Sequence, residues 1–505
     1  MDSVVTQGES PGDSPDRIGG WTPRLVFSLI SMVLLLEILA VSYSMVGMAI
    51  PAISEHFGTT QGAWMITAFL LVGAVTGPIL GKLADVYGKR KVLLLTVAVA
   101  AVGTLIAALA PNYAILVFGR CLSGALASAV FLSYSLIRDT FPQRAVPLAV
   151  SICTSGMGLI SIVAPFLGGW LLDSFGFRSM FWFFTITLVL CCTMIFISTP
   201  ESAVRLRSAV DYLGAVLLGA GIACILVAIS FGPDWGWTNG STLAVLIVGI
   251  ALIIGWIISA TKVVDPLIDL DVLRRRPVFL TAIASGFTYG GSALLTTLLP
   301  MLVMTPVALG LGYGFGISAK EVAIFQAPNS IAVVLAGMVA GTVIGRGVRP
   351  RAVLAVGMVV LAVGFLLISA IHDNYALMLV FMGVAGLGIG MGYSSIPNIV
   401  IETVPPQLQA TTSSVVNSMQ SIISSVLTLV AFTVMNNSFL APSATGSGHG
   451  AVYTDTGFQV AFLIGAVGAG LGCVAALLLP RRIERVRLPA GQEEKGDEGV
   501  VVPAR

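Results

Sequence analysis

Charged side chains are scarce in this sequence: Asp, Glu, Lys and Arg make up 10% of its 505 residues. A soluble domain carries about 25%. Hydrophobic residues account for 56% of the chain, and they gather in runs of about 20 residues, the length at which a helix crosses a bilayer. The scarcity of charge therefore excludes a soluble globular protein and predicts an all-α polytopic membrane protein.

Features that other classes of protein need are also missing. The six cysteines fall inside apolar runs without a C-x-x-C pair, and the three histidines lie in separate predicted loops, which predicts neither a disulfide framework nor a metal site. The sequence has no Walker-type glycine loop, so no nucleotide partner is expected. Lys and Arg are dispersed and form no basic face for nucleic acid. No cluster of nucleophile, ligands or paired acids predicts an enzyme.

Fourteen apolar runs predict fourteen membrane-spanning helices. They lie at 25–50, 62–81, 91–110, 114–137, 146–171, 180–198, 211–231, 241–261, 278–302, 320–345, 352–371, 375–399, 410–435 and 458–480. If the N-terminus is cytoplasmic, nearly all of the 26 Lys and Arg fall in cytoplasmic segments, the exceptions being Arg120, Arg178 and Lys320. This asymmetry obeys the positive-inside rule and predicts a multi-pass protein of the plasma membrane with both termini cytoplasmic.

A weak internal repeat predicts how the helices are grouped. The stretch "GKLADVYGKRKVL" begins at Gly81 and "GTVIGRGVRPRAVL" at Gly341, each after the second helix of a six-helix set. Repeated halves with a site between them are a common transporter plan. We therefore predict six-helix bundles at 25–200 and 278–480, a linker at 201–277 with two additional helices, and disordered cytoplasmic tails at 1–24 and 481–505.

Three segments outside the spans have their own composition. Residues 303–319 are rich in glycine and either extend a helix or form a flap on the outside. Residues 436–457 are polar and are expected to form a flexible outside loop. Residues 262–277 are expected to form an amphipathic segment at the inner interface.

The loop "GKLADVYGKRK" at 81–91 contains an acid and two glycines between two helices. Gly81 and Gly88 permit a tight turn, and Asp85 can bond to a helix N-terminus or to an arginine. The basic residues after Gly88 are expected to anchor the loop to the inner leaflet. Ordinary positive-inside loop chemistry is the alternative to a functional role.

This loop resembles the G-x-L-a-D-r-x-G-r-k loop of the major facilitator superfamily, in which the aspartate latches the two bundles in the outward-facing state. The resemblance implies that role for Asp85, with Arg138 or Arg144 as its cytoplasmic partner. The implied conformational latch comprises Gly81, Asp85, Gly88, Lys89, Arg90, Arg138 and Arg144.

Two further stretches resemble motifs of the same family. In "LVFGRCLSGA", Leu116, Arg120 and Gly124 match the fourth-helix motif implicated in proton transfer, with Ser123 in place of the usual glutamine. The alternative is an arginine that snorkels to the outer interface. In "APFLGGWLLD", the antiporter motif of the fifth helix is matched at Pro165, Gly168 and Gly169. Generic packing of small residues is the alternative there.

The stretches "FGPDWGWTNG" and "DPLIDLDVLRRRP" resemble the fourteen-helix drug:proton antiporter subfamily, which is of the multidrug efflux type. Its first helix usually carries an Asp and an Asn before a proline. Here Ser42 and Gly47 stand at those places, and the acid Glu37 comes about a turn and a half earlier.

Glu37 is the unusual residue of the first span, because a charged acid inside a bilayer costs about 2.5–3.5 kcal/mol on insertion scales. We predict that it is the proton site, the acidic contact for cationic substrates, or both in competition, with Arg120 as its charged neighbour. The alternative is a protonated acid bonded to a neighbouring helix. Polar and aromatic residues of other spans are candidates for a central cavity: Tyr43, Trp64, Tyr289, Gln326, Asn329, Tyr393, Asn398, Asn417 and Gln420.

The resemblance implies two six-helix bundles plus two additional central helices, and a monomeric exporter of amphipathic or cationic small molecules. It works by alternating access between the two sides of the bilayer, without a cofactor, and is driven by the proton gradient. An exporter dedicated to one host metabolite, antibiotic or lipid is the closest alternative, and a nutrient importer would share the fold.

Overall fold

The structure is a computed structural model that describes residues 22–480, apart from 60–63, 157–159, 207–210, 237, 264–265, 269, 271–273, 318–320, 437 and 443–450. The predicted tails lie outside the described residues, except for the last residues of the first one. Helices dominate the described chain, and the two strands are short.

The N-terminal half consists of helices that follow the apolar runs. They are α1 (Pro23–Phe57), α2 (Trp64–Tyr87), α3 (Lys89–Leu109), α4 (Tyr113–Gly124), the 3-10 turn η1 (Ala125–Ser128), α5 (Ala129–Thr140), α6 (Val146–Gly156), α7 (Ile160–Phe175) and α8 (Arg178–Ser198). α4, η1 and α5 together form one span, Tyr113–Thr140.

Two helices, α9 (Tyr212–Trp235) and α10 (Gly240–Ala260), separate this half from the next. The C-terminal half comprises α12 (Arg276–Val303), η2 (Val307–Leu309), α13 (Val322–Gly345), α14 (Pro350–Ala370), α15 (Tyr375–Thr403), η3 (Pro406–Leu408), α16 (Gln409–Asn436), β1 (Phe439–Pro442), β2 (Ala451–Tyr453) and α17 (Asp455–Leu478).

Thirteen helices in the described chain are long and apolar enough to cross a membrane. The remaining predicted span, 146–171, is covered by α6 and α7 on either side of residues 157–159. The prediction of an all-α membrane fold with fourteen spans is therefore confirmed, with the short antiparallel pair β1–β2 as an addition.

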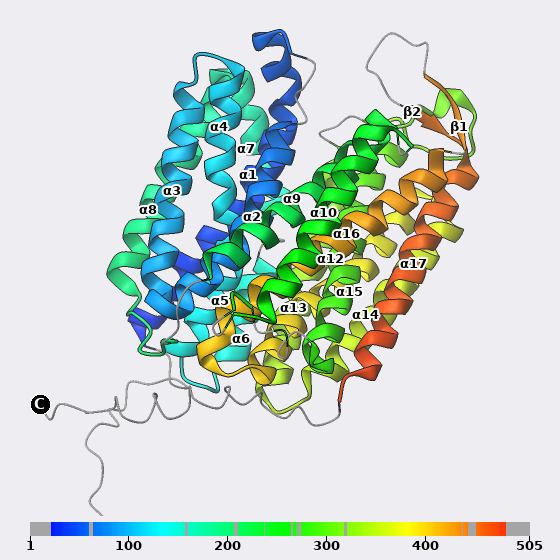
Figure 1. Cartoon of the computed structure of the whole chain (residues 1–505). Coiled ribbons are helices and arrows are strands. Elements are labelled where there is room, and N and C mark those ends of the chain that lie inside the picture. Colours follow the sequence, from blue (N-terminus) through cyan, green and yellow to red (C-terminus); the bar gives the residue numbers. More distant parts are fainter. Residues whose placement is uncertain are drawn as a thin grey trace, which may run out of the picture.

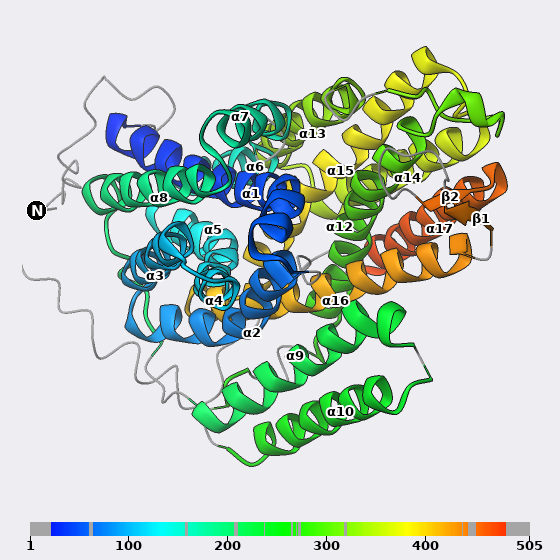
Figure 2. The same cartoon turned by 90° about the horizontal axis from the view of Figure 1, so that it is seen from above.

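Each half has its own apolar core, one built from α1 to α8 and the other from α12 to α17. Figure 1 shows the two halves side by side, and Figure 2 shows α9 and α10 along one flank of the molecule. α9 packs on α2 and α16, and α10 packs on α9. Glycines permit some of the close helix contacts, since a Cβ on Gly103 of α3 would lie 2.6 Å from the carbonyl oxygen of Gly119 on α4.

The glycine-rich segment after α12 forms a flap, and does not extend the helix. α12 ends at Val303, and Gly310, Gly312, Gly314 and Gly316 all have positive φ, a conformation that ends regular helix. The Phe315 ring stacks on Phe325 of α13 with centroids 5.4 Å apart. The hydroxyl of Tyr313 donates to the carbonyl oxygen of Tyr453 in β2 at 2.6 Å. We call this end of the molecule the flap end.

Replacing Tyr313 by phenylalanine is expected to lower the free energy of unfolding by about 1 kcal/mol, the net contribution of one hydrogen bond. Burial raises the pKa of Tyr313 above its ordinary value of 10.0. The contact is therefore complete below pH 10 and is lost only when more alkaline solution removes the phenolic proton. Thermal unfolding of purified protein at neutral pH measures the effect, with the exposed Tyr212→Phe as control. Equal midpoints for the two variants would contradict the assigned contact.

Candidate functional site

Asp85, in the last turn of α2, joins the two halves. Its carboxylate accepts hydrogen bonds from the backbone N–H of Ala410 at 3.2 Å and of Thr411 at 2.8 Å, and from the Thr411 hydroxyl at 2.8 Å. These donors belong to the first turn of α16, where backbone N–H groups have no partner inside the helix and the helix dipole favours an anion. Asp85 therefore caps a helix of the opposite half. We call this end of the molecule, opposite the flap end, the latch end.

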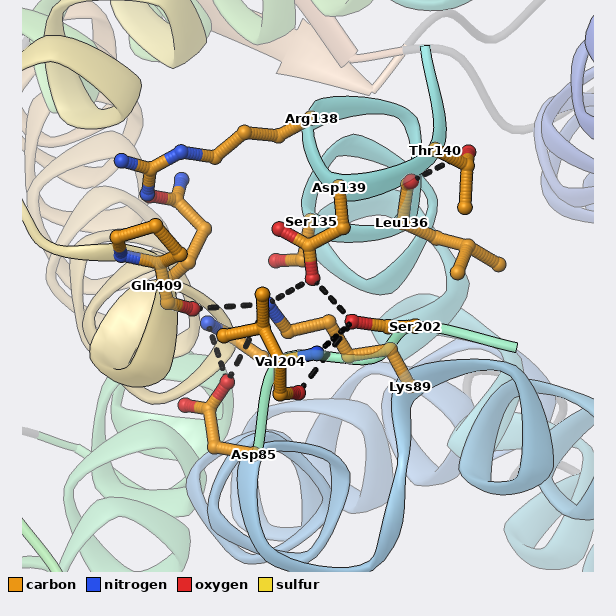
Figure 3. Close-up of polar contacts among 12 residues, drawn as sticks. Asp85, Lys89, Ser135, Leu136, Arg138, Asp139, Thr140, Ser202, Val204 and Gln409 are labelled. Carbon is orange, nitrogen blue, oxygen red and sulfur yellow. Dashed lines mark hydrogen bonds and ion pairs between the residues drawn. The ribbon is translucent and has the colours of Figure 1, made fainter. Parts of the chain in front are cut away.

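Lys89 is buried beside Asp85 and does not reach the inner leaflet. Its ammonium group bonds to the carboxylate of Asp139 at 2.7 Å and to the carbonyl oxygen of Pro406 at 2.8 Å, and lies 3.9 Å from Asp85 (Figure 3). The expectation that Lys89 anchors the loop to lipid is wrong. Its charge is enclosed by two carboxylates of its own half and by the carbonyl of Pro406, which belongs to the opposite half. Asp139 is a site residue that sequence reasoning missed.

Neither arginine proposed as the partner of Asp85 occupies that place. The guanidinium of Arg138 donates to the side-chain oxygen of Gln409 (Figure 3). It also donates to the carbonyl oxygen of Val404 at 2.7 Å. Arg138 therefore joins the halves through separate contacts. Arg144 is exposed in the turn before α6, and its side chain makes no hydrogen bond or ion pair within the described residues.

The segment after α8 braces the α2–α3 turn, a role that the sequence did not indicate. The carboxylate of Glu201 accepts the backbone N–H groups of Arg90 at 2.9 Å and Lys91 at 3.1 Å in the first turn of α3. Gly88 has φ +117, and a Cβ there would lie 3.0 Å from that carboxylate. The Arg90 guanidinium itself bonds to the carbonyl oxygen of Phe196. Glycine at 88 thus permits both the turn and the approach of Glu201.

Further contacts between the halves continue from the latch end into the bundle. A Cβ on Gly81 would lie 2.8 Å from the Ser414 hydroxyl of α16. The hydroxyls of Ser151 on α6 and Ser394 on α15 are 2.6 Å apart. A Cβ on Gly337 of α13 would lie 1.6 Å from the Ser155 hydroxyl oxygen. The hydrogen bonds between the halves that the structure describes gather at this end, so the described conformation is closed at the latch end.

Glu37 lies inside the N-terminal half, with 7% of its surface exposed. A Cβ on Gly156 of α6 would lie 3.3 Å from the Glu37 carboxylate. Cys153 of α6 is close enough to interact electrostatically with that carboxylate. Cys153 in turn is close enough to Tyr134 on α5 for the two groups to interact electrostatically, and Tyr134 lies beside Tyr289 of α12. Cys153 and Tyr134 thus lie between Glu37 and the opposite half. Sequence reasoning missed Tyr134, although a tyrosine well inside an apolar span is a signal that could have found it.

Arg120 is fully buried on α4, so it does not snorkel to the interface. Its Nε donates to the carbonyl oxygen of Met65 at 3.1 Å and its Nη1 to the Ser42 hydroxyl at 3.1 Å. The guanidinium carbon lies 4.5 Å from the centre of the Phe69 ring. The predicted pairing of Arg120 with Glu37 is absent, because Ser42, five residues farther along α1, faces the arginine.

The proposed antiporter motif lies on α7, where Gly168 packs against α1. A Cβ on Gly168 would lie 3.0 Å from Cγ of Met45, whereas one on Gly169 would meet no atom within 4 Å. The side chain of Pro165 lies outside the described residues. The observed role of Gly168 is therefore close helix packing, which leaves its part in exchange a prediction.

Two of the nine cavity candidates come together across α12 and α15. The rings of Tyr289 and Tyr393 stack with centroids 4.3 Å apart. Gln420 of α16 accepts a hydrogen bond from Ser285 of α12 at 2.6 Å, within the same half. Trp64 is the first residue of α2, and the side chain of Tyr43 lies outside the described residues. The remaining candidates are spread over α13, α15 and α16: Gln326, Asn329, Asn398 and Asn417.

Two bundles of membrane-crossing helices, joined at one end by an acid that caps a helix of the opposite bundle, define a polytopic membrane transporter. The chain belongs to the Major Facilitator Superfamily, whose family model matches residues 32–428. It is a multi-pass membrane protein, and the relatives described next are bacterial, which indicates the plasma membrane.

An uncharacterized MFS-type transporter of Mycobacterium tuberculosis is 28% identical over 68% of this chain, which spans about half of that relative's length. Multidrug resistance protein 3 of Bacillus subtilis is 24% identical over 82% of this chain and 80% of its own. Multidrug resistance protein Stp of Mycobacterium tuberculosis is 28% identical over 75% of this chain and 70% of its own.

A solved structure supports the fold. The crystal structure of the human organic anion transporter MFSD10 (TETRAN) matches 91% of this chain and 100% of that chain, with a TM-score of 0.59 and 16% sequence identity. At this identity the similarity shows the fold alone.

Proposed function

We propose that this protein is a proton-coupled exporter of amphipathic or cationic small molecules that works by alternating access. The observation that carries the proposal is the placement of Glu37, a carboxylate buried within the N-terminal half, on the side where Cys153 and Tyr134 lie between it and the opposite half. The multidrug resistance proteins among its relatives support the choice of solute.

Electrostatics explains how a buried acid couples the two fluxes. An ionised carboxylate is costly inside the bilayer, and rearranging the bundles around it would be unfavourable. Either a proton or a cationic solute removes that cost. The transporter therefore changes conformation when Glu37 is protonated or holds a cationic solute, and does not change when Glu37 is ionised and holds neither. One ligand is thereby exchanged for the other across the membrane.

The charge distribution supports the proposed orientation. Lys and Arg are concentrated in the loops at the latch end, and the positive-inside rule places such loops in the cytoplasm. Both termini are then cytoplasmic, and the conformation closed at the latch end is outward-facing. We propose a monomer as the transporting unit, because each monomer contains both halves.

Gradient-driven uptake of ethidium into proteoliposomes tests the function. With the lumen one pH unit more acidic than the outside, exchange of one proton per solute should accumulate ethidium about tenfold, since 1.4 kcal/mol is a factor of ten. A protonophore should abolish the accumulation. Accumulation of one host metabolite but of no drug would favour the dedicated exporter. Uptake that ignores both the gradient and the protonophore would overturn the proposal.

A further inference from the structure

One nitrogen of the Arg120 guanidinium takes no part in the contacts that the structure describes. Met65 and Ser42 accept from Nε and Nη1, but the buried Nη2 has no hydrogen-bond partner within the described residues. The ion pairs that the structure describes at Lys89 and at His372 do not include Arg120. Arg120 is therefore a fully buried cation whose described partners are a carbonyl, a hydroxyl and an aromatic ring.

These partners leave most of the charge uncompensated. A guanidinium stays protonated in proteins, and the effective cost of burying an ion is several kcal/mol unless an opposite charge accompanies it. The Phe69 face supplies about 2 kcal/mol, which offsets only part of that cost. The surroundings of Nη2 therefore favour an anion.

Glu37 does not supply that anion in this conformation. It lies five residues before Ser42 on α1, a rise of about 7.5 Å along the helix, and its carboxylate faces Gly156 on α6. The residues that contact Arg120, namely Ser42, Met65 and Phe69, are all uncharged. The counter-charge must come from outside the described chain.

We propose that Arg120 binds the carboxylate of an amphiphilic solute that enters from the flap end. Arg120 lies seven residues into α4 from Tyr113, about 10 Å along the helix, and Met65 belongs to the first turn of α2 at the same end. The Phe69 ring supplies an apolar surface beside the charge. The inference extends the proposed function, because it adds carboxylate-bearing amphiphiles to the solutes, but binding itself needs no proton gradient.

Binding of decanoate to the purified full chain in nanodiscs tests the inference, with decanamide and decylamine as neutral and cationic matches. Decanoate should bind saturably and about tenfold or more tightly than decanamide, the factor expected for a hydrogen-bonded charge pair. Acetate and chloride test whether a small anion suffices, and should compete only weakly.

Variants at the site separate anion binding from folding. Ser42→Asp places a carboxylate within reach of Nη1, so it should satisfy Arg120 internally and weaken decanoate binding about tenfold or more. Ser42→Asn keeps a neutral acceptor and should retain binding. Arg120→Gln should lose binding, whereas Arg178→Gln, which removes a positive charge elsewhere in the same half, should retain it.

Three results would overturn the inference: equal binding of decanoate and decanamide, undiminished decanoate binding by Ser42→Asp, or full competition by chloride at the concentration of decanoate. These outcomes are independent of transport. A protein that binds decanoate through Arg120 but shows no gradient-driven uptake would keep this site and refute the proton-coupled exporter.

Discussion

Replacing Glu37 by glutamine is expected to abolish the accumulation of solute against its gradient while leaving downhill exchange intact. Glutamine matches the shape of the acid but cannot gain or lose a proton, so the obstacle that an ionised carboxylate sets to conformational change disappears. In proteoliposomes with a gradient of one pH unit, the solute ratio should fall from about ten to about one.

The matched control for this variant is Glu55→Gln on the same helix, because the Glu55 side chain is exposed. It should accumulate solute like the unaltered protein. Counterflow of labelled solute, which needs no proton, shows whether each variant still transports. Full accumulation by Glu37→Gln would show that another group carries the proton.

Replacing Asp85 by asparagine is expected to open the latch end. Asparagine keeps one acceptor oxygen but loses the charge that holds the first turn of α16, a contact of about 1.5–3 kcal/mol for hydrogen bonds to a charged group. The closed conformation should become about ten- to a hundredfold less favoured. Lys89 would keep Asp139 as its partner, so the fold should persist.

Hydrogen exchange of a peptide that includes Ala410 and Thr411 measures this change directly. Backbone amides in a first helical turn have no partner within the helix, and here Asp85 supplies one. Their exchange should quicken about tenfold or more in Asp85→Asn. The exposed Asp173→Asn on α7 should leave it unchanged. Equal protection in all three proteins would remove Asp85 from the latch.

The spans were predictable because hydrophobicity along the chain sets them almost alone. Fourteen apolar runs correspond to the observed helices, since any backbone in a bilayer must satisfy its hydrogen bonds internally. The sequence did not show whether residues 303–319 extend a helix or form a flap, because glycines at positive φ depend on contacts far along the chain. The contact of Tyr313 with β2 spans 140 residues.

The pairing of charged residues was less predictable than their importance. Sequence reasoning singled out Asp85 and Arg120, but it paired Asp85 with Arg138 or Arg144 and Arg120 with Glu37. The structure instead gives Asp85 the N-terminus of α16, and gives Arg120 neutral acceptors. Backbone groups and hydroxyls also form hydrogen bonds with buried charged groups, and a sequence does not show which of them a fold brings near.

The burial of Lys89 illustrates the same limit. A cluster of basic residues after a membrane span is usually a lipid anchor. Here the buried carboxylate of Asp139, at the end of α5, is stabilised by an ion pair with Lys89, which the turn at Gly88 directs inward. Asp139 lies 50 residues away in sequence, so only the packing of α5 beside α3 makes the pair.

Proton release from the purified protein tests the central claim most directly, because it needs neither a gradient nor a vesicle. In weakly buffered detergent solution near neutral pH, addition of a transported cationic solute should release protons from the unaltered protein and from Glu55→Gln, and none from Glu37→Gln. Solute binding without proton release from the unaltered protein, or undiminished release from Glu37→Gln, would contradict exchange at this buried carboxylate.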